Sequence, residues 1–170
     1  PSLLEYKFFE NRNYINFNKL IVRSGGNDVL TAHIRDYYCL NLLEKMDFYG
    51  QATKPVVLFA NGQYLGVFFL NEGLDEQYVE NKRGIEETAL DLLKKDHTDV
   101  NYIANVGTVD KFNTFSNFVI NNSMASESNY LQAMAQLDRP KYLDWVAMGA
   151  IVNNRDWVFA DNNIRVFADN

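Results

Sequence analysis

The chain has 170 residues, of which 47% are hydrophobic, so it can bury one sizeable core, and its length favours a single domain. A formal net charge of −6 argues against nucleic-acid binding, because no basic stripe is available to displace counterions from phosphates. The single cysteine, Cys39, excludes an internal disulfide framework, and no run reaches the ~18 apolar residues that a membrane-spanning helix needs.

The first clear element is a β-branched run that ends at two glycines. Residues 19–23 (Lys-Leu-Ile-Val-Arg) predict a strand, and Gly25-Gly26 predict the turn that follows it. Either Asn27 or Asp28 can then cap a helix, because apolar residues recur at helical spacing in the stretch that follows. The pattern predicts an amphipathic helix over residues 28–48.

The strongest local signal is a β-hairpin. Two apolar runs, residues 55–60 and 63–70, flank Asn61-Gly62, and an Asn-Gly pair accepts the positive φ angles of a tight turn. Gly66 interrupts the second run, which indicates either a β-bulge or a place where another group approaches the backbone closely.

The second half of the chain is predicted to be mostly helical. Helical spacing predicts a short helix over residues 74–81, whereas residues 91–129 predict only helix and loop. A last helix over residues 141–152, capped by Asp138, has apolar residues nearly all round, so we expect it to be buried. Strands, one helix, a hairpin and then mostly helices predict an α+β fold with two unequal parts.

A polar stretch directly after this last helix carries the residues best suited to catalysis. Asp156 offers a base or a ligand for a hard cation, and Asn162 and Asn163 offer neutral oxygens that can join a carboxylate around Mg²⁺. In protein kinases a catalytic Asp accepts the substrate proton, and an Asn about five residues later holds magnesium. The same residue types also favour turns and helix ends, and on spacing alone that structural interpretation is the stronger one.

Several stretches together resemble the CotH kinase family of spore-coat protein H, in sequence and in order. They are residues 19–28 (Lys-Leu-Ile-Val-Arg-Ser-Gly-Gly-Asn-Asp), residues 34–36 (Ile-Arg-Asp), the hairpin with its trailing acid (residues 57–72), and residues 154–157 (Asn-Arg-Asp-Trp) before Asn162-Asn163-Ile164. The resemblance covers most of the chain. The Arg-Ser-Gly-Gly-Asn-Asp run and the Asn-Gly-x-Tyr-x-Gly hairpin are specific in combination.

The resemblance implies a divergent protein-kinase-like fold that binds ATP and Mg²⁺ and transfers the γ-phosphoryl group to Ser or Thr hydroxyls of a protein substrate. It implies one CotH kinase-like domain over residues 1–170. Its N-lobe, an antiparallel sheet with one helix, would cover residues 1–70, and a hinge-like connector and mostly helical C-lobe would cover residues 71–170. Members of the family resemble secreted or cell-envelope proteins of bacteria, including spore coats.

The resemblance also assigns roles to particular residues. Asp156 would be the catalytic aspartate, and Asn162 or Asn163 the magnesium-binding amide. Residues 71–74 would lie where a kinase hinge meets adenine, which makes Glu72 a nucleotide-site residue, although an acid here also suits a helix N-terminus.

Two charged residues of the first half are candidates for the phosphate site. Arg23 ends a strand beside the glycine pair, where a guanidinium and backbone amides can meet a phosphate, and its alternative is a surface salt bridge. Asp36 has no lysine or arginine one helical turn away, so we expect it to be solvated or to pair with a cation elsewhere in the fold. A kinase needs an acid on this helix to orient its phosphate-binding cation, and Asp36 is the candidate.

The sequence departs from the kinase pattern in two places. Asn162 and Asn163 follow Asp156 by six and seven residues, and only one strand-like run, residues 164–168, comes after them. We therefore expect the second metal-binding acid of a kinase to lie beyond Asn170, and the domain to be incomplete at its C-terminus. On this interpretation the full-length protein is a Ser/Thr kinase, and residues 1–170 alone are inactive. The alternative function is a catalytically silent envelope or coat protein that keeps the scaffold for binding.

Overall fold

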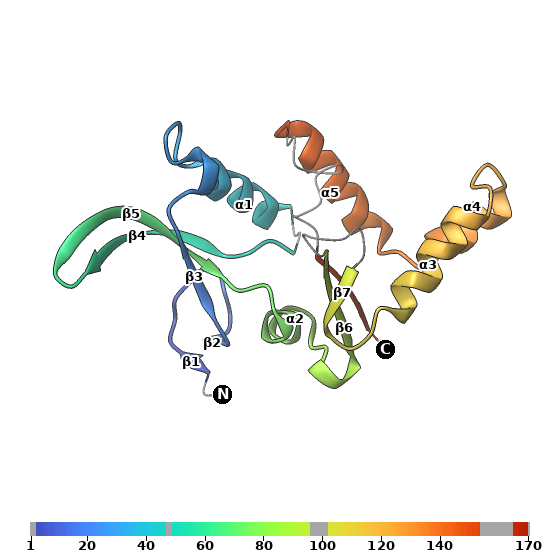
Figure 1. Cartoon of the computed structure of the whole chain (residues 1–170), viewed down its shortest axis with the longest axis horizontal. Coiled ribbons are helices and arrows are strands. Elements are labelled where there is room, and N and C mark those ends of the chain that lie inside the picture. Colours follow the sequence, from blue (N-terminus) through green and yellow to red (C-terminus); the bar gives the residue numbers. More distant parts are fainter. Residues whose placement is uncertain (1–2, 47–48, 96–101, 154–164, 170) are drawn as a thin grey trace. The chain divides into compact units, whose positions relative to one another are not determined.

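A computed structural model of the chain describes residues 3–46, 49–95, 102–153 and 165–169. It divides into two compact units, Pro1–Gly84 and Ile85–Asn170, each with its own antiparallel sheet (Figure 1). The α+β class is confirmed, with five α-helices among the described residues. The chain passes from the first unit to the second between Gly84 and Ile85. The expected single domain, with an N-lobe over residues 1–70 and a connector and C-lobe over residues 71–170, stays a prediction.

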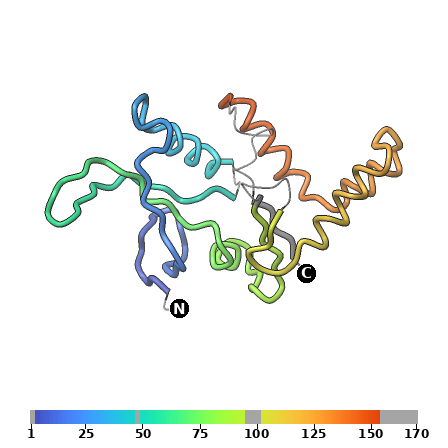
Figure 2. The backbone as a smooth tube through the Cα atoms, in the orientation of Figure 1, coloured from blue at the N-terminus to red at the C-terminus, as the bar shows by residue number. Residues whose placement is uncertain are grey.

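The sheet of the first unit confirms the predicted strand and hairpin. Its strand order is β3 (Leu20–Arg23), β5 (Gln63–Glu72) and β4 (Thr53–Ala60), with both pairs antiparallel. Asn61 and Gly62 have φ angles of 51° and 80°, as a two-residue hairpin turn of this kind requires. Figure 2 shows the two strands of the hairpin running side by side to this turn.

The predicted interruption at Gly66 is a β-bulge. Leu58 pairs with Gly66 but Phe59 pairs with Tyr64, so the register shifts by one residue and Leu65 is left over. Gly66 has a φ of 112°, a conformation that costs glycine little and strains other residues.

The helix predicted from residue 28 begins later than expected, so that prediction is wrong at its N-terminal end. Helix α1 spans Arg35–Lys45, and a 3₁₀ turn (η1, Gly26–Asp28) and a loop precede it. The carboxylate of Asp28 does accept a backbone N–H of the helix, that of Arg35, at 3.0 Å, but it does so across the intervening loop. The loop contains His33 at a φ of 64°, which is incompatible with a continuous helix.

Different elements cover the two faces of this sheet, as Figure 1 shows for the first unit. On one face, Leu70 packs against a buried cluster of Phe9, Phe17 and Ala52. Phe17 belongs to the short strand β2 (Asn16–Phe17), which pairs with β1 (Leu4–Glu5). The residue next to Leu70, Phe69, points to the other face and stacks on Tyr37 of α1, with ring centroids 5.6 Å apart. The sheet is therefore held between an aromatic cluster and α1.

Helix α2 (Glu76–Arg83) confirms the short helix predicted after the hairpin. Asp75 caps it, because its side chain accepts a hydrogen bond from the N–H of Tyr78 at 3.1 Å. Gly84, at a φ of 69°, ends it with a left-handed residue.

The second unit contains a three-stranded sheet that the sequence pattern did not predict in full. A 3₁₀ turn (η2, Glu87–Ala89) leads into β6 (Leu90–Lys95), which pairs with β7 (Tyr102–Val106) on one side and with β8 (Arg165–Asp169) on the other. The prediction of helix and loop for residues 91–129 is therefore wrong at β6 and β7. A short apolar run such as β6 cannot be told from a buried helical turn by periodicity.

Helices account for the rest of the described second unit. They are α3 (Asp110–Asn121), α4 (Glu127–Met134) and α5 (Arg139–Ile151). Asp138 caps α5 as predicted, since its carboxylate accepts the N–H of Lys141 at 3.3 Å. The expected burial of α5 is wrong, because Leu143 is 58% and Ile151 73% exposed.

We predict that Gly62→Ala destabilises the protein by about 1 kcal/mol, because an alanine at a φ of 80° is strained even where no neighbour is close. Urea unfolding monitored by circular dichroism measures the change. Asn61→Gly, which relieves the neighbouring positive φ, is the matched control and should leave the free energy of unfolding within about 0.5 kcal/mol of the parent. A Gly62→Ala midpoint equal to that of the control would contradict the turn assignment.

Candidate functional site

An ion pair joins the last residue of β3 to the first turn of α1. The Nη1 atom of Arg23 lies 3.5 Å from Oδ2 of Asp36, and the two side chains are 49% and 50% exposed. Gly26 lies against both, because a Cβ built on it would be 3.1 Å from the Nη2 atom of Arg23 and 3.8 Å from that same Oδ2 atom. The structure thus brings together three features that the sequence singled out: the arginine, the glycine turn and the acid.

The other glycine of the turn is needed for close packing. A Cβ on Gly25 would come within 2.5 Å of the Cδ2 atom of His33, and the φ of Gly25 is 91°. The His33 ring in turn lies edge-on to Phe69, with ring centroids 5.6 Å apart. The turn that places Arg23 beside α1 is therefore tightly constrained.

Glu72 lies at the other end of the same strand pair, and its carboxylate faces the protein interior. In the ladder, Leu20 is opposite Glu72 whereas Arg23 is opposite Phe69, so Arg23 and Glu72 are separated by roughly 10 Å of strand. Glu72 is 1% exposed. The structure does not bring the two predicted nucleotide-site residues together.

Both carboxylate oxygens of Glu72 are engaged within the protein. The Oε2 atom accepts hydrogen bonds from Nε of Arg12 at 3.0 Å and from the backbone N–H of Ala52 at 3.1 Å. The Oε1 atom accepts a short hydrogen bond from the hydroxyl of Tyr14. Gln51 donates to the backbone carbonyl of Glu72 at 2.7 Å, so the connector after β5 is fixed from several directions.

Arg12 is a buried residue that the sequence analysis missed. Besides Glu72, it contacts Oε1 of Glu44 on α1 at 2.5 Å and donates from Nη2 to the carbonyl of Gly50 at 3.0 Å. It is only 3% exposed. No local pattern could have identified it, because Glu44, Gly50 and Glu72 lie 32 to 60 residues further along the chain.

The protonation of these groups follows from their surroundings. Burial lowers the pKa of Arg12, but the hydrogen bond to Glu44 and the charge of Glu72 outweigh burial and raise that pKa above its ordinary value. Burial and then the hydrogen bond to Glu72 raise the pKa of Tyr14. Burial and the charge of Glu72 raise the pKa of Tyr78, whose hydroxyl donates to the Gly50 carbonyl at 3.2 Å. The guanidinium thus stays charged and both phenols stay protonated donors.

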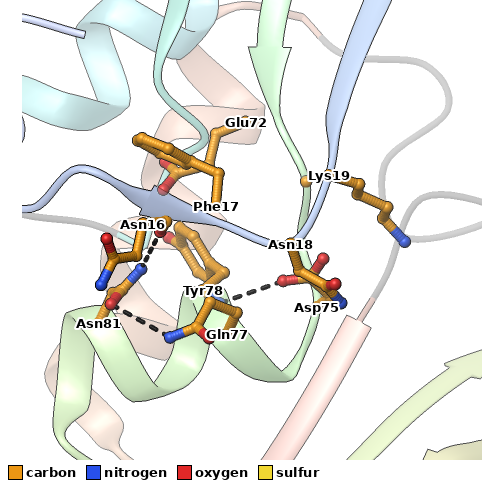
Figure 3. Close-up of a pocket in the computed structure, with 10 residues that line it drawn as sticks. Asn16, Phe17, Asn18, Lys19, Glu72, Asp75, Gln77, Tyr78 and Asn81 are labelled. Atoms are coloured by element: carbon orange, nitrogen blue, oxygen red, sulfur yellow. Dashed lines mark hydrogen bonds between the residues drawn. The ribbon is translucent and has the colours of Figure 1, made fainter. Parts of the chain in front are cut away.

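A small polar pocket lies beside Glu72, Gly73 and Asp75, where β5 leads into α2 (Figure 3). Its volume is about 150 Å³, part of it open to solvent, and amide side chains line much of it. Asn81 closes it on one side by donating to the carbonyl of Asn16 at 2.9 Å, and Gln77 donates to Asn81 at 3.3 Å. The enclosed part of this volume leaves almost no room even for a water-sized molecule, so the pocket cannot hold a nucleotide.

Besides Glu72, Asp75 is an acidic residue that lines this pocket. One of its oxygens caps α2, and the other, Oδ2, is buried without a hydrogen-bond partner among the residues that the structure describes. Burial raises the pKa of Asp75, and the N–H of Tyr78 opposes that rise. The observed contacts account for Asp75 as a helix cap.

The predicted catalytic aspartate, Asp156, and the predicted magnesium ligands, Asn162 and Asn163, lie outside the described residues. Within the described part of the chain, no group of three or more His, Cys, Asp or Glu side chains is arranged to hold a metal ion. Over the same residues, no helix is both long and apolar enough to cross a bilayer.

The geometry defines an α+β protein with small antiparallel sheets, in which a strand carries a cation that pairs with an acid on the following helix. This arrangement is compatible with a kinase-like fold. The family described as CotH kinase protein matches residues 3–170, and the chain belongs to that family. The family resemblance inferred from the sequence is therefore confirmed, and membership suggests a kinase-like function with use of ATP and Mg²⁺. No curated protein and no solved structure gives a significant match.

We predict that Glu72→Gln lowers the free energy of unfolding by about 3 kcal/mol, because it leaves Arg12 with one buried carboxylate partner fewer. Glu76→Gln is the matched control. Glu76 accepts a hydrogen bond from Asn18 at 2.8 Å outside the Arg12 network, and its change should cost less than about 1 kcal/mol. Urea unfolding of the two variants gives the comparison, and equal losses would show that Glu72 has no special part in stability.

Proposed function

We propose that this protein is a CotH-like protein kinase that transfers the γ-phosphoryl group of ATP to Ser or Thr hydroxyls of a protein substrate. The observation that carries the proposal is the Arg23–Asp36 pair, with 3.5 Å between nitrogen and oxygen. In protein kinases a strand cation pairs with an acid on the next helix and holds the α- and β-phosphates of ATP. Membership of the CotH kinase family supports the same assignment.

Arg23 suits phosphate binding by its chemistry and by its exposure. A guanidinium presents planar N–H donors that can bind a phosphate in a bidentate manner, and it stays charged at any physiological pH. Because Arg23 is about half exposed, a phosphate can reach it without unfolding the sheet. Asp36 holds the guanidinium from one side and leaves its other donors for the nucleotide.

We assign the chemical step to the segment after α5, on the family resemblance. Asp156 accepts the proton of the substrate hydroxyl. The hydroxyl oxygen bonds to the γ-phosphorus, and the bond between that phosphorus and the ADP oxygen breaks. Asn162 or Asn163 would hold Mg²⁺ through its amide oxygen. The bound ion would supply positive charge that offsets the negative charge of the ATP phosphates.

For Glu72 we propose an indirect part in nucleotide binding. Its carboxylate is engaged by Arg12, Tyr14 and Ala52, so it supports the connector over residues 71–74 instead of touching the nucleotide. The backbone of this connector then forms the edge that meets adenine.

We also propose that the protein acts in the cell envelope or after secretion, and that its substrate is a protein of a coat or envelope layer. The family name refers to spore-coat protein H, and this is the support for the location.

We predict that Arg23→Ala weakens binding of Mg²⁺-ATP at least about tenfold, because a charge-assisted hydrogen bond contributes ~1.5–3 kcal/mol. Arg35→Ala is the matched control. Arg35 is an exposed arginine on the same helix as Asp36, but it pairs with Asp28 at 3.0 Å. Isothermal titration of the purified protein with Mg²⁺-ATP should show a change within about twofold for the control. Equal affinities of the two variants would remove Arg23 from the phosphate site.

We predict that Asp156→Asn abolishes phosphate incorporation and preserves nucleotide binding, because it removes the base and leaves the Arg23–Asp36 pair in place. Incorporation from γ-labelled ATP by the full-length protein in the presence of Mg²⁺ is the measurement. Equal incorporation by parent and variant would exclude Asp156 as the base. Nucleotide binding by the parent without any incorporation would favour the alternative, a catalytically silent binding protein on the same scaffold.

A further inference from the structure

The Arg12 guanidinium contacts three parts of the first unit that lie 32 to 60 residues further along the chain. It binds α1 through Glu44 at 2.5 Å, the end of β5 through Glu72 at 3.0 Å, and the segment before β4 through the carbonyl of Gly50 at 3.0 Å. Each contact uses a different nitrogen of the planar group. A lysine has one nitrogen and could not reach all three partners in this geometry.

The network is built from groups that are costly to bury. An isolated buried charge costs several kcal/mol, and a buried ion pair is often no more stable than an apolar replacement of the same shape. Arg12 and Glu72 are nevertheless almost fully buried, at 3% and 1% exposure, and each charge faces an opposite charge. This arrangement contributes defined geometry at the junction more than it contributes net stability.

The feature of the fold that the Arg12 network bears on is the direction of α1. Near its N-terminus the helix is held by the stacking of Tyr37 on Phe69 and by the hydrogen bond from the Arg35 N–H to Asp28, and near its C-terminus by the contact of Glu44 with Arg12. Anchors at one end alone would let the helix pivot, whereas anchors at both ends fix its direction. Asp36 precedes Glu44 by eight residues, or about 12 Å along the helix axis, so a pivot at one end displaces the other.

We propose that Arg12 is a positioning residue, which fixes the direction of α1 through Glu44 and thereby holds Asp36 against Arg23. The proposal rests on the proposed function, since it concerns the ion pair to which phosphate binding is assigned. Arg12 touches neither Arg23 nor Asp36 and acts on them only through the helix.

A double-mutant cycle tests the proposal. Glu44→Ala releases α1 from Arg12, and we expect it to weaken binding of Mg²⁺-ATP about tenfold in the parent but less than about twofold in the Asp36→Ala background. Residues 36 and 44 are about 12 Å apart and share no partner, so a merely structural loss would be additive. Additive effects would overturn the proposal. If Glu44→Ala does not fold, Glu44→Gln, which keeps the shape and one acceptor oxygen, replaces it in the cycle.

Lys82→Ala is the matched control. Lys82 of α2 lies 3.6 Å from the same oxygen of Glu44, so this change removes a cation from Glu44 without touching Arg12. We expect nucleotide affinity to stay within about twofold of the parent, as for a partly exposed pair. A loss as large as that of Glu44→Ala would assign the anchor to α2 and overturn the role of Arg12.

Hydrogen exchange separates failure of this proposal from failure of the proposed function. If Asp36→Ala binds Mg²⁺-ATP as well as the parent, the phosphate assignment is wrong, and the exchange of the α1 amides (residues 35–45) then decides whether Arg12 positions the helix. Faster exchange there in Glu44→Ala, but not in Lys82→Ala, supports the anchor. Unchanged exchange in both variants overturns it.

Discussion

The first unit depends on one buried guanidinium, because Arg12 is where its N-terminal segment, α1 and the strand β5 are joined. Two carboxylates and a carbonyl surround that group at hydrogen-bond distance. Removing any one of them would leave an unpaired charge or donor in the interior, which costs more than the net contribution of the contact. The sheet and helix therefore have an arrangement in which each guanidinium nitrogen of Arg12 has an acceptor, and the exposed Arg23–Asp36 pair forms within it.

The parts of the fold that the sequence predicted are those governed by local backbone chemistry. Asn61-Gly62 specified the hairpin through its positive φ angles, Gly66 marked the bulge, and Asp138 capped α5. The start of α1 was mispredicted because the carboxylate of Asp28 bonds the helix from across a loop. In the sequence, Asp28 looks like an ordinary helix N-cap. Only the structure shows that a loop separates it from the first residue of α1.

The candidate site likewise contains residues that the sequence indicated and residues that only the structure reveals. The family resemblance indicated Arg23 as a phosphate residue and Asp36 as the acid that orients it, and the structure places the two together. It could not indicate Arg12, whose partners are set by long-range packing. Glu72 was selected by its position after the hairpin, but a sequence pattern does not reveal whether a carboxylate faces solvent or the interior. The roles of Asp156, Asn162 and Asn163 stay predictions.

The charges at Arg12, Glu44 and Glu72, of which Arg12 and Glu72 are buried, also constrain how this sequence can diverge. A neutral residue at position 12 would leave Glu72 without a cation and Glu44 with Lys82 alone, so we expect such a change together with compensating changes at both acids. Among homologous chains, the three positions should consequently vary as a set. We therefore expect substitutions at the basic residue and at the two acids to be linked, although Arg12 and Glu72 are 60 positions apart in the chain.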